Sequence, residues 1–212
     1  MHHDVPRNAR LPRGGLYAIS DGSRADLLTV CAVVLRGGAT LLQYRNKDAG
    51  PARRHDEAKA LLALCASFAV PLIVNDDVEL AAAIGAAGVH LGEHDVDIAR
   101  ARARLGAAAI IGVSCYDSLA RARQLVAAGA DYLAFGAFFT SATKPGARRA
   151  TPALLRAAKS LSRPLVAIGG ITADNAQPLL DAGADFLAVI SGVFQAADPA
   201  AAARRYAALF QK

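Results

Sequence analysis

Short apolar runs alternate along the chain with longer stretches in which apolar residues recur at helical spacing. Runs of four to eight residues rich in aliphatic side chains are typical of buried strands, whereas a 3.6-residue period is typical of helices that cover a sheet. Eight runs are predicted as strands: Leu16–Ser20, Thr40–Tyr44, Leu72–Asn75, Val89–Leu91, Ile110–Val113, Tyr132–Phe135, Leu165–Ile168 and Phe186–Ile190. The clearest predicted helices between them are Ala25–Arg36, Ala52–Ser67, Val78–Ile84 and Leu119–Ala127.

One helix-to-strand junction occurs four times, as RGGATLL, GAAGVHL, AGADYLAF and AGADFLAV. In each, a glycine is predicted to end the helix in a left-handed conformation, and a strand starts at once. Eight βα units in 212 residues favour a single-domain α/β fold, the (β/α)8 TIM barrel. A doubly wound open sheet is the alternative, but it normally carries a GxGxxG loop after its first strand, where this chain has SDGSRAD. We expect the barrel over residues 14–212, after a basic, poorly ordered tail at 1–13.

Composition and charge narrow the class of protein. The chain is 54% hydrophobic, enough for one large core, yet no run approaches the roughly 18 apolar residues of a membrane span, and the first residues lack the apolar region of a secretory signal. Three scattered cysteines without a CxxC pair indicate reduced thiols and a cytoplasmic location. The net charge of +6 comes without the aromatic stacking platforms that nucleic-acid binding would need. It is most simply explained by solvated helix faces, and it could instead favour a polyanionic small substrate; composition alone does not choose between them. The oligomeric state stays open, with a homo-oligomer as one option.

Carboxylates follow two neighbouring predicted strands, at the end of the barrel where active sites lie. Asp76 and Asp95 could share Mg²⁺, which takes a few carboxylates together with phosphate oxygens. The alternative is structural, because Asp76 and Glu79 have the spacing of a capping box and Asp77 could cap a helix equally well. Spacing alone leaves both interpretations open.

Two candidate anion sites lie on the same predicted rim. The loops AIGGIT and VISGVF follow the last two strands, where such barrels commonly bind phosphate through glycine amides, although ordinary turn glycines would look the same. Gln43, Arg45 and Lys47 alternate, so a strand continuing past Tyr44 would point all three to one side and suit a diphosphate. Lys144, in the loop TSATKPG, could reach the same ligand, with solvated loop polarity as the simpler reading. His90 is expected to be a packed strand residue.

The motifs QYRNK, VNDDVELA…GVHLGEHD, IGVSCYD, DYLAFGAFFTSATKPGA and VAIGGIT…GADFLAVISGVF resemble, in order and over nearly the whole chain, the thiamine-phosphate synthase family. The resemblance implies a barrel enzyme that joins hydroxymethylpyrimidine diphosphate to hydroxyethylthiazole phosphate. The products would be thiamine phosphate and diphosphate, formed by a dissociative displacement assisted by Mg²⁺.

Site residues carried over by motif fall into three groups. The pyrimidine diphosphate would be held by Gln43, Arg45, Lys47, Asn75, Ser114 and Lys144. The thiazole phosphate would be held by Ser141, Ala142, Thr143, Gly170, Ile190 and Ser191. Mg²⁺ would be bound by Asp76 and Asp95, and the residues acting on the leaving group would be Arg45, Ser114 and Lys144.

The chain departs from the family pattern at three positions. Ala137 and Thr140 stand where prolines are common, and Asn46 stands where a glutamate is common. Two rival functions are a thiazole tautomerase, which resembles the tail of this chain but needs a histidine at 137, and a non-enzymatic sensor of a phosphorylated ligand. The sensor would have no use for paired aspartates beside an Arg/Lys pair.

Overall fold

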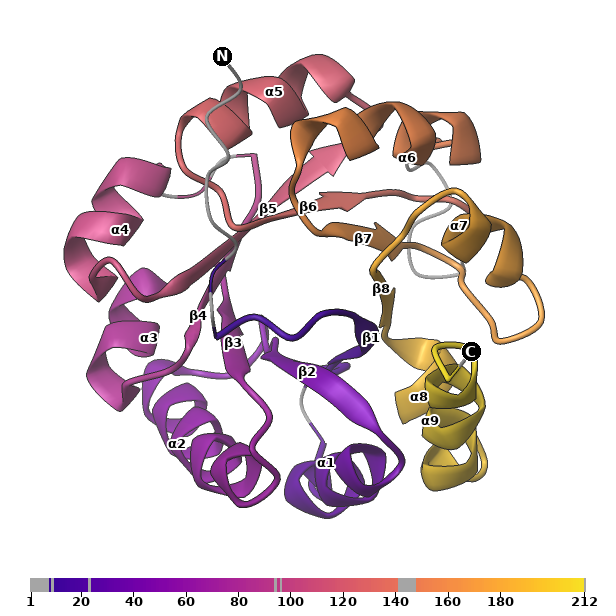
Figure 1. Cartoon of the computed structure of the whole chain (residues 1–212). Coiled ribbons are helices and arrows are strands. Elements are labelled where there is room, and N and C mark those ends of the chain that lie inside the picture. Colours follow the sequence, from indigo (N-terminus) through magenta and orange to yellow (C-terminus); the bar gives the residue numbers. More distant parts are fainter. Residues whose placement is uncertain are drawn as a thin grey trace.

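The computed structural model describes residues 8, 10–22, 24–93, 95, 97–140 and 148–211. In this part of the chain, eight parallel strands close into a single barrel in sequence order, and β8 pairs with β1 (Figure 1). The strands are β1 (Gly15–Ile19), β2 (Ala39–Tyr44), β3 (Leu72–Asn75), β4 (Gly88–Leu91), β5 (Ile110–Tyr116), β6 (Tyr132–Phe135), β7 (Leu165–Ile168) and β8 (Phe186–Val189).

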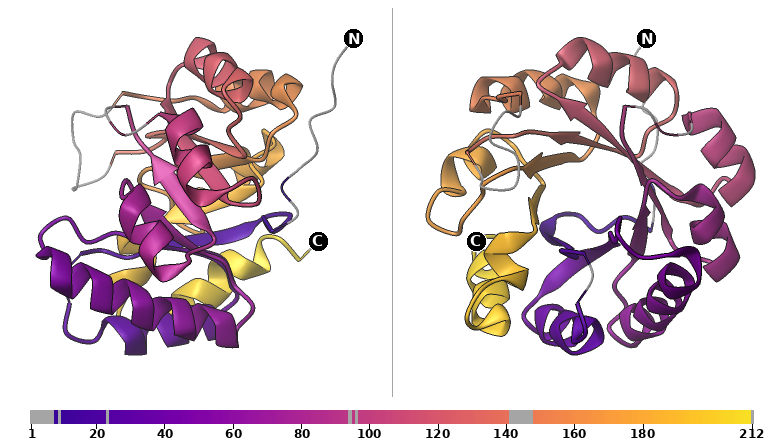
Figure 2. Two further views of the ribbon diagram at one scale, coloured as in Figure 1. Left: turned by 90° about the vertical axis from the view of Figure 1, so that its left-hand side faces the viewer. Right: turned by 180° about the vertical axis from the view of Figure 1, so that it is seen from behind.

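Helices form a ring outside the barrel, as the side and rear views in Figure 2 also show. They are α1 (Leu27–Arg36), α2 (Pro51–Ser67), α3 (Val78–Ile84), α4 (Ile98–Leu105), α5 (Leu119–Ala127), α6 (Pro152–Ala158), the 3-10 helix η1 (Lys159–Leu161), α7 (Gln177–Asp181), α8 (Ser191–Phe194) and α9 (Pro199–Ala208). Among the described residues, no helix is long and apolar enough to cross a membrane.

The predicted TIM barrel is confirmed, and pairing of β1 with β8 excludes the open sheet. Every strand end lies within one residue of its predicted place, except that β5 continues past Val113 to Tyr116. The register with β6 shifts between Ser114 and Tyr116. A bulge of this kind re-aims a side chain at the end of a strand, and apolar patterning did not reveal it.

The core has two shells, one between strands and helices and one inside the barrel. Rings of Tyr17, Tyr132 and Phe186 fill much of the interior and are fully buried. Gly112 makes room for them, because a Cβ atom there would lie 1.8 Å from Cζ of Tyr132. All three cysteines are free and buried, as expected.

The segment before β1 also contributes to the interior shell. Leu11 is buried among the interior residues, and the side chain of Asn8 donates a hydrogen bond to the carbonyl of Ala109 (3.0 Å). Packing therefore begins before the predicted boundary at Gly14. Residues 1–7 and 9 lie outside the described residues, so disorder of the tail stays a prediction there.

The repeated junction has a physical explanation. Gly129 and Gly183 end α5 and α7 with positive φ angles of 100° and 99°. In the AGAD versions, the backbone N–H of Asp131 donates to the carbonyl of Ile111 while its carboxylate accepts the N–H of the same residue (2.8 and 2.7 Å). Asp185 makes the same pair of hydrogen bonds with Leu165. Each aspartate therefore ties the strand that it precedes to the neighbouring strand.

The sequence also predicts helix caps at Thr151 before Pro152, at Thr172, and at Asp198 before Pro199, and their outcomes are mixed. Asp198 caps α9 by accepting the N–H of Ala201 (2.9 Å), which confirms the prediction. Thr151 precedes α6 without a side-chain capping bond. Thr172 was wrong as a helix cap: it closes a turn with Asn175, because α7 begins only at Gln177.

Candidate active site

An acidic pair lies at the carboxyl ends of β3 and β4. Asp76 follows β3, and its backbone N–H donates to the carbonyl of His90 (2.9 Å), while its carboxylate pairs with the ammonium of Lys47 (2.9 Å). The carboxyl group of Asp95 interacts directly with that of Asp76 and accepts the N–H of Gly92. The structure thus brings together both predicted metal ligands and one predicted diphosphate ligand.

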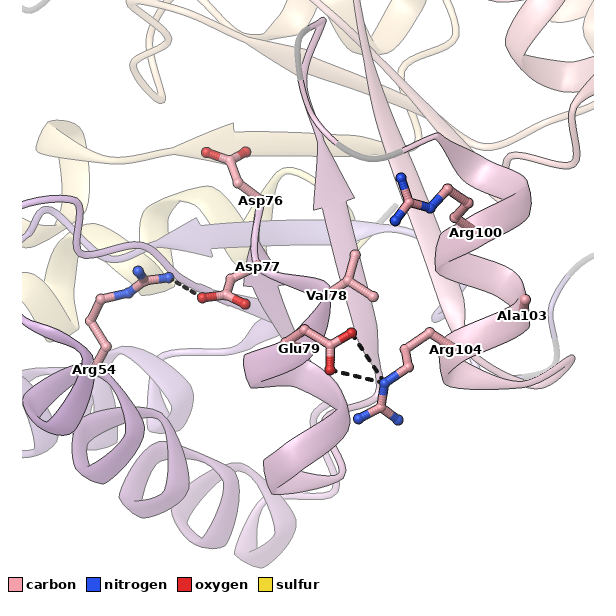
Figure 3. A pocket seen from close by; sticks show the side chains of 8 residues that line it. All are labelled: Arg54, Asp76, Asp77, Val78, Glu79, Arg100, Ala103 and Arg104. Carbon is pink, nitrogen blue, oxygen red and sulfur yellow. Dashed lines mark hydrogen bonds and ion pairs between the residues drawn. The ribbon is translucent and has the colours of Figure 1, made fainter.

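Asp76, rather than its neighbour Asp77, is the residue aimed at this site. Asp77 caps α3 by accepting the N–H of Leu80 (2.8 Å) and pairs with Arg54 (2.5 Å). Asp76 has a left-handed φ of 62°, which is costly for a residue other than glycine. Figure 3 shows the Asp76 carboxylate directed away from the Arg54–Asp77 pair. The capping-box interpretation of Asp76 is therefore wrong.

The two carboxyl groups have opposite pKa shifts. Burial raises the pKa of Asp95, and the adjacent Asp76 raises it further. For Asp76, burial opposes ionisation, but the hydrogen bonds with Lys47 and Asp95 outweigh it and lower the pKa. Two carboxyl groups in contact ionise together only if positive charge is supplied beside them.

The donor set fits Mg²⁺ better than zinc. Among the described residues, no group of three or more His, Cys, Asp or Glu side chains could hold a metal ion. Structural and catalytic zinc sites need three or four such ligands, whereas Mg²⁺ is commonly held by one or two carboxylates together with water and substrate phosphates. Asp76 and Asp95 provide two carboxylates of this kind.

The hollow beside the acidic pair is divided between two cavities. A cavity of about 240 Å³ is bordered by residues at the ends of β2 and β3, among them Asn46, Lys47, Asn75 and Asp76, and by Arg54 of α2. A wider groove of about 790 Å³ between α3 and α4 also reaches Asp76 (Figure 3). Three of the predicted site residues, Lys47, Asn75 and Asp76, therefore line these cavities.

The loop after β2 does not have the predicted geometry. The strand ends at Tyr44, so Gln43, Arg45 and Lys47 do not share one face of a strand. Gln43 is buried inside the barrel, whereas Lys47 is exposed and reaches Asp76. The backbone of Arg45 is fixed by the hydroxyl of Ser20, which accepts its N–H (2.8 Å) and donates to its carbonyl (3.1 Å).

Glu57 on α2 holds this loop from outside the barrel. One of its carboxylate oxygens accepts hydrogen bonds from the Tyr44 hydroxyl and the Asn46 amide, both at 2.8 Å, and the other accepts from Arg53 (2.6 Å). The side-chain oxygen of Asn46 in turn accepts the N–H of Ala49 (3.2 Å). Asn46 is one of the departures from the family pattern. Its buried side chain links the loop to Glu57 on α2 and stabilises it.

Ser114 faces the barrel interior, where its hydroxyl is hydrogen bonded to His90. His90 is hydrogen bonded through Nε2 to the Ser114 hydroxyl (2.9 Å) and through Nδ1 to the Tyr132 hydroxyl (3.0 Å). Burial lowers the pKa of His90 to about 4, against a smaller opposite effect of Asp76, so the ring is neutral at pH 7. His90 is a packed strand residue, as expected, and it is also hydrogen bonded to a residue that motif resemblance places at the pyrimidine diphosphate.

The two predicted phosphate loops lie side by side at the ends of β7 and β8. Gly170 has a φ of 64°, and its carbonyl accepts a hydrogen bond from the Asn175 amide (3.1 Å). Ile190 immediately precedes α8, and Ser191 begins it. A Cβ atom on Gly192 would lie 3.3 Å from the carbonyl of Ile171, so the loops touch.

Four predicted residues lie outside the described residues: Ser141, Ala142, Thr143 and Lys144. Asn75 ends β3 and borders the smaller cavity. The residues that sequence reasoning missed are Tyr17, Tyr132 and Glu57. Each is an ordinary strand or helix residue by pattern, and only the three-dimensional contacts distinguish it.

A closed (β/α)8 barrel with paired carboxylates, a lysine and two phosphate-type loops on its carboxyl rim defines a TIM-barrel enzyme acting on small molecules. The family model described as Thiamine monophosphate synthase matches residues 16–193. The chain belongs to this family.

Individual relatives agree. The thiamine-phosphate synthase of Xanthomonas campestris pv. campestris (strain 8004) is 56% identical over 206 residues, covering 96% of this chain and 97% of the relative. That of Azoarcus sp. (strain BH72) is 58% identical over 199 residues, covering 92% and 97%. The solved thiamine phosphate pyrophosphorylase from Pyrococcus furiosus superposes with a TM-score of 0.86 at 34% identity, covering 96% and 98%. These relatives are transferases, which disfavours the sensor and tautomerase alternatives.

Proposed function

We propose that this protein joins hydroxymethylpyrimidine diphosphate to hydroxyethylthiazole phosphate, forming thiamine phosphate and releasing diphosphate. The observation that carries the proposal is the Asp76–Asp95 pair with Lys47 on the rim of a barrel that belongs to this family. A pair of carboxylates beside an ammonium is suited to a Mg²⁺–diphosphate unit, because the carboxylates would hold the cation, and the cation and the lysine would both attract phosphate oxygens.

Two separate anion sites support the choice of two phosphorylated substrates. The pyrimidine diphosphate is assigned to Gln43, Arg45, Lys47, Asn75, Ser114 and Lys144. The thiazole phosphate is assigned to Ser141, Ala142, Thr143, Gly170, Ile190 and Ser191. In support, the ends of β2 to β5 carry the first group's described members and the ends of β7 and β8 carry those of the second.

The reaction needs no protein nucleophile. The C–O bond between the pyrimidine methylene and the diphosphate breaks, and its electron pair leaves with the diphosphate. The thiazole nitrogen then donates its lone pair to the resulting pyrimidine-stabilised carbocation. The protein's work is to hold both partners in contact and to place positive charge where negative charge grows. Arg45, Lys47 and Lys144 are the residues assigned to that charge.

Asp76 and Asp95 would hold the Mg²⁺. When bound, the ion supplies positive charge to the leaving diphosphate. Lys47 already pairs with Asp76. Its ammonium would therefore lie close to the leaving diphosphate and could interact with the negative charge that grows there. We further propose a cytoplasmic enzyme, since three buried free thiols suit a reducing compartment.

Neighbouring aspartates offer a matched test. Asp76→Ala and Asp77→Ala differ by one position, but only Asp77 caps a helix. With both substrates and Mg²⁺, we measure thiamine phosphate by fluorescence after oxidation to thiochrome. Asp76→Ala should lose about 100-fold or more in turnover, corresponding to roughly 3 kcal/mol of charge stabilisation, and should keep its stability.

Asp77→Ala should do the reverse. It should lose about 1 kcal/mol or more of stability through the missing cap and retain its turnover. A wild type that forms no thiamine phosphate would refute the function. An Asp76→Ala enzyme with normal turnover would refute the metal assignment alone.

A further inference from the structure

A continuous chain of hydrogen bonds runs through the barrel interior from Gln43 to Ser114. The Gln43 amide donates to the Tyr17 hydroxyl (2.6 Å), which is bonded to the Tyr132 hydroxyl (2.8 Å). Tyr132 is bonded to His90 (3.0 Å), and His90 to Ser114 (2.9 Å). Its two ends are residues assigned to the pyrimidine diphosphate, while its three middle members have no assigned role.

The orientation of the Gln43 amide gives the chain of hydrogen bonds a direction, because the NH₂ that faces Tyr17 can only donate. The NH₂ of Gln43 donates to the oxygen of Tyr17, so the Tyr17 proton is available for Tyr132. In this order of protons, Tyr132 donates to Nδ1 of His90. A neutral imidazole that accepts at Nδ1 carries its proton on Nε2, and that proton is donated to the oxygen of Ser114. The hydroxyl hydrogen of Ser114 is then not used by any bond within this chain of hydrogen bonds.

Packing holds the chain in this arrangement. Tyr17 and Tyr132 are fully buried and meet edge to face with ring centres 5.9 Å apart. The rings of His90 and Tyr132 are stacked, with centres 5.6 Å apart and planes 18° from parallel. Arg121 donates to the carbonyl of Ser114 (2.9 Å) and fixes its backbone. No buried side-chain nitrogen or oxygen among the described residues lacks a partner.

We propose that Tyr17, Tyr132 and His90 are positioning residues that keep the Ser114 hydroxyl pointed as a donor at the leaving diphosphate. The inference rests on the proposed function and deepens it. Ser114 donates a hydrogen bond to a phosphate oxygen while the C–O bond breaks, and its proton stays on Ser114. Such a donor matters more as negative charge grows, so the chain acts on turnover more than on ground-state binding.

With the protons in the opposite order, the Ser114 hydroxyl would not be a donor to the diphosphate. If the Gln43 amide presented its oxygen to Tyr17, every bond would reverse, and Ser114 would donate to His90. Ser114 would then offer only lone pairs to an anionic phosphate. The tautomer of His90 therefore decides between the two orders.

The first measurement is ¹⁵N NMR of the histidine side chains in the free enzyme, with His90 assigned by comparison with His90→Gln. The proposal requires a proton on Nε2 and a bare Nδ1. Tyr132→Phe should give a mixture of tautomers, because the donor to Nδ1 is gone. As a matched control, Tyr206→Phe removes another buried tyrosine hydroxyl, one that donates to the Ile171 carbonyl, and should leave the tautomer unchanged. A wild-type His90 protonated on Nδ1 would overturn the proposal.

The second measurement is a double-mutant cycle in turnover. Ser114→Ala and Tyr132→Phe should each lower kcat about tenfold or more, with little change in KM for the pyrimidine diphosphate. Tyr132→Phe should have no further effect in the Ser114→Ala background, because it acts through Ser114. Effects that multiply would show that Tyr132 acts independently, and would sink the inference.

Folding failure and failure of the function are separable in this design. If Tyr132→Phe does not fold, Tyr17→Phe breaks the same series of hydrogen bonds one bond earlier and replaces it in the double-mutant cycle. Effects of Tyr17→Phe and Ser114→Ala that multiply would likewise contradict the proposal. A wild type that makes no thiamine phosphate refutes the proposed function. An active wild type whose Ser114→Ala variant has normal kcat refutes only the role of Ser114 and the chain that serves it.

Discussion

Burial of His90 predicts an unusual loss of stability in mild acid. Its pKa is lowered from 6.5 to about 4, mainly by burial, against a smaller opposite effect of the Asp76 carboxylate. Between these two values, the unfolded chain binds a proton at this position that the folded protein does not. The free energy of unfolding therefore falls as the pH falls through this window, and the loss is complete below about pH 4.

The size of the effect follows from the two pKa values. At about 1.4 kcal/mol for each pH unit between them, the protein should lose about 3 kcal/mol through His90 alone. Carboxylates also titrate in this range, so the wild type must be compared with His90→Gln, which has the same carboxylates but no imidazole. The advantage of wild type over variant at pH 7 should shrink by about 3 kcal/mol at pH 4.

Urea unfolding at a series of pH values measures this difference, followed by far-UV circular dichroism because the chain has no tryptophan. An NMR titration of His90 in the folded wild type gives the pKa directly. Parallel pH profiles for wild type and His90→Gln would refute the reasoning. They would mean that His90 titrates at the same pH in the folded and unfolded chain.

Three further predictions concern the rim. Glu57→Ala should raise KM for the pyrimidine diphosphate several-fold in steady-state kinetics, since it frees the loop that presents Lys47, and Glu57→Gln should be milder because its amide oxygen can still accept a hydrogen bond. Ser191→Ala should weaken thiazole phosphate in titration calorimetry and spare the pyrimidine diphosphate; Gly170 is a poorer probe, because a Cβ there would lie 2.7 Å from a neighbouring carbonyl. Lys144→Ala should lower the single-turnover rate more than the affinity for the pyrimidine diphosphate. If Lys144 only anchors the substrate, the affinity should fall more than the rate.

The barrel was predictable because local signals agreed along the whole chain. Apolar runs, helical spacing and glycine junctions each mark the same boundaries, so strand ends fell within one residue of their places. The exception, the end of β5, depends on a register shift beside Ser114 that leaves no apolar signature.

The site was predictable only in part, because its deciding features are non-local. Spacing could not choose between Asp76 and Asp77; the left-handed backbone at Asp76 makes that choice. The bond between Tyr17 and Tyr132 joins residues 115 positions apart, and the bond from Tyr132 to His90 spans 42. No periodicity reports such pairs, so a strand tyrosine that organises a site looks the same as one that fills a core.

The paired AGAD junctions give the second half of the barrel a modular construction. Asp131 latches β6 to β5, and Asp185 latches β8 to β7, each through two hydrogen bonds to one residue of the earlier strand. A polypeptide cut between β6 and β7 would leave both latches inside their own fragments, whereas a cut between β5 and β6 would separate Asp131 from Ile111. Each pair of parallel strands with its connecting helix is therefore one βαβ unit, and the enzyme is better split into complementing halves, or opened for a foreign domain, between these two units than within either.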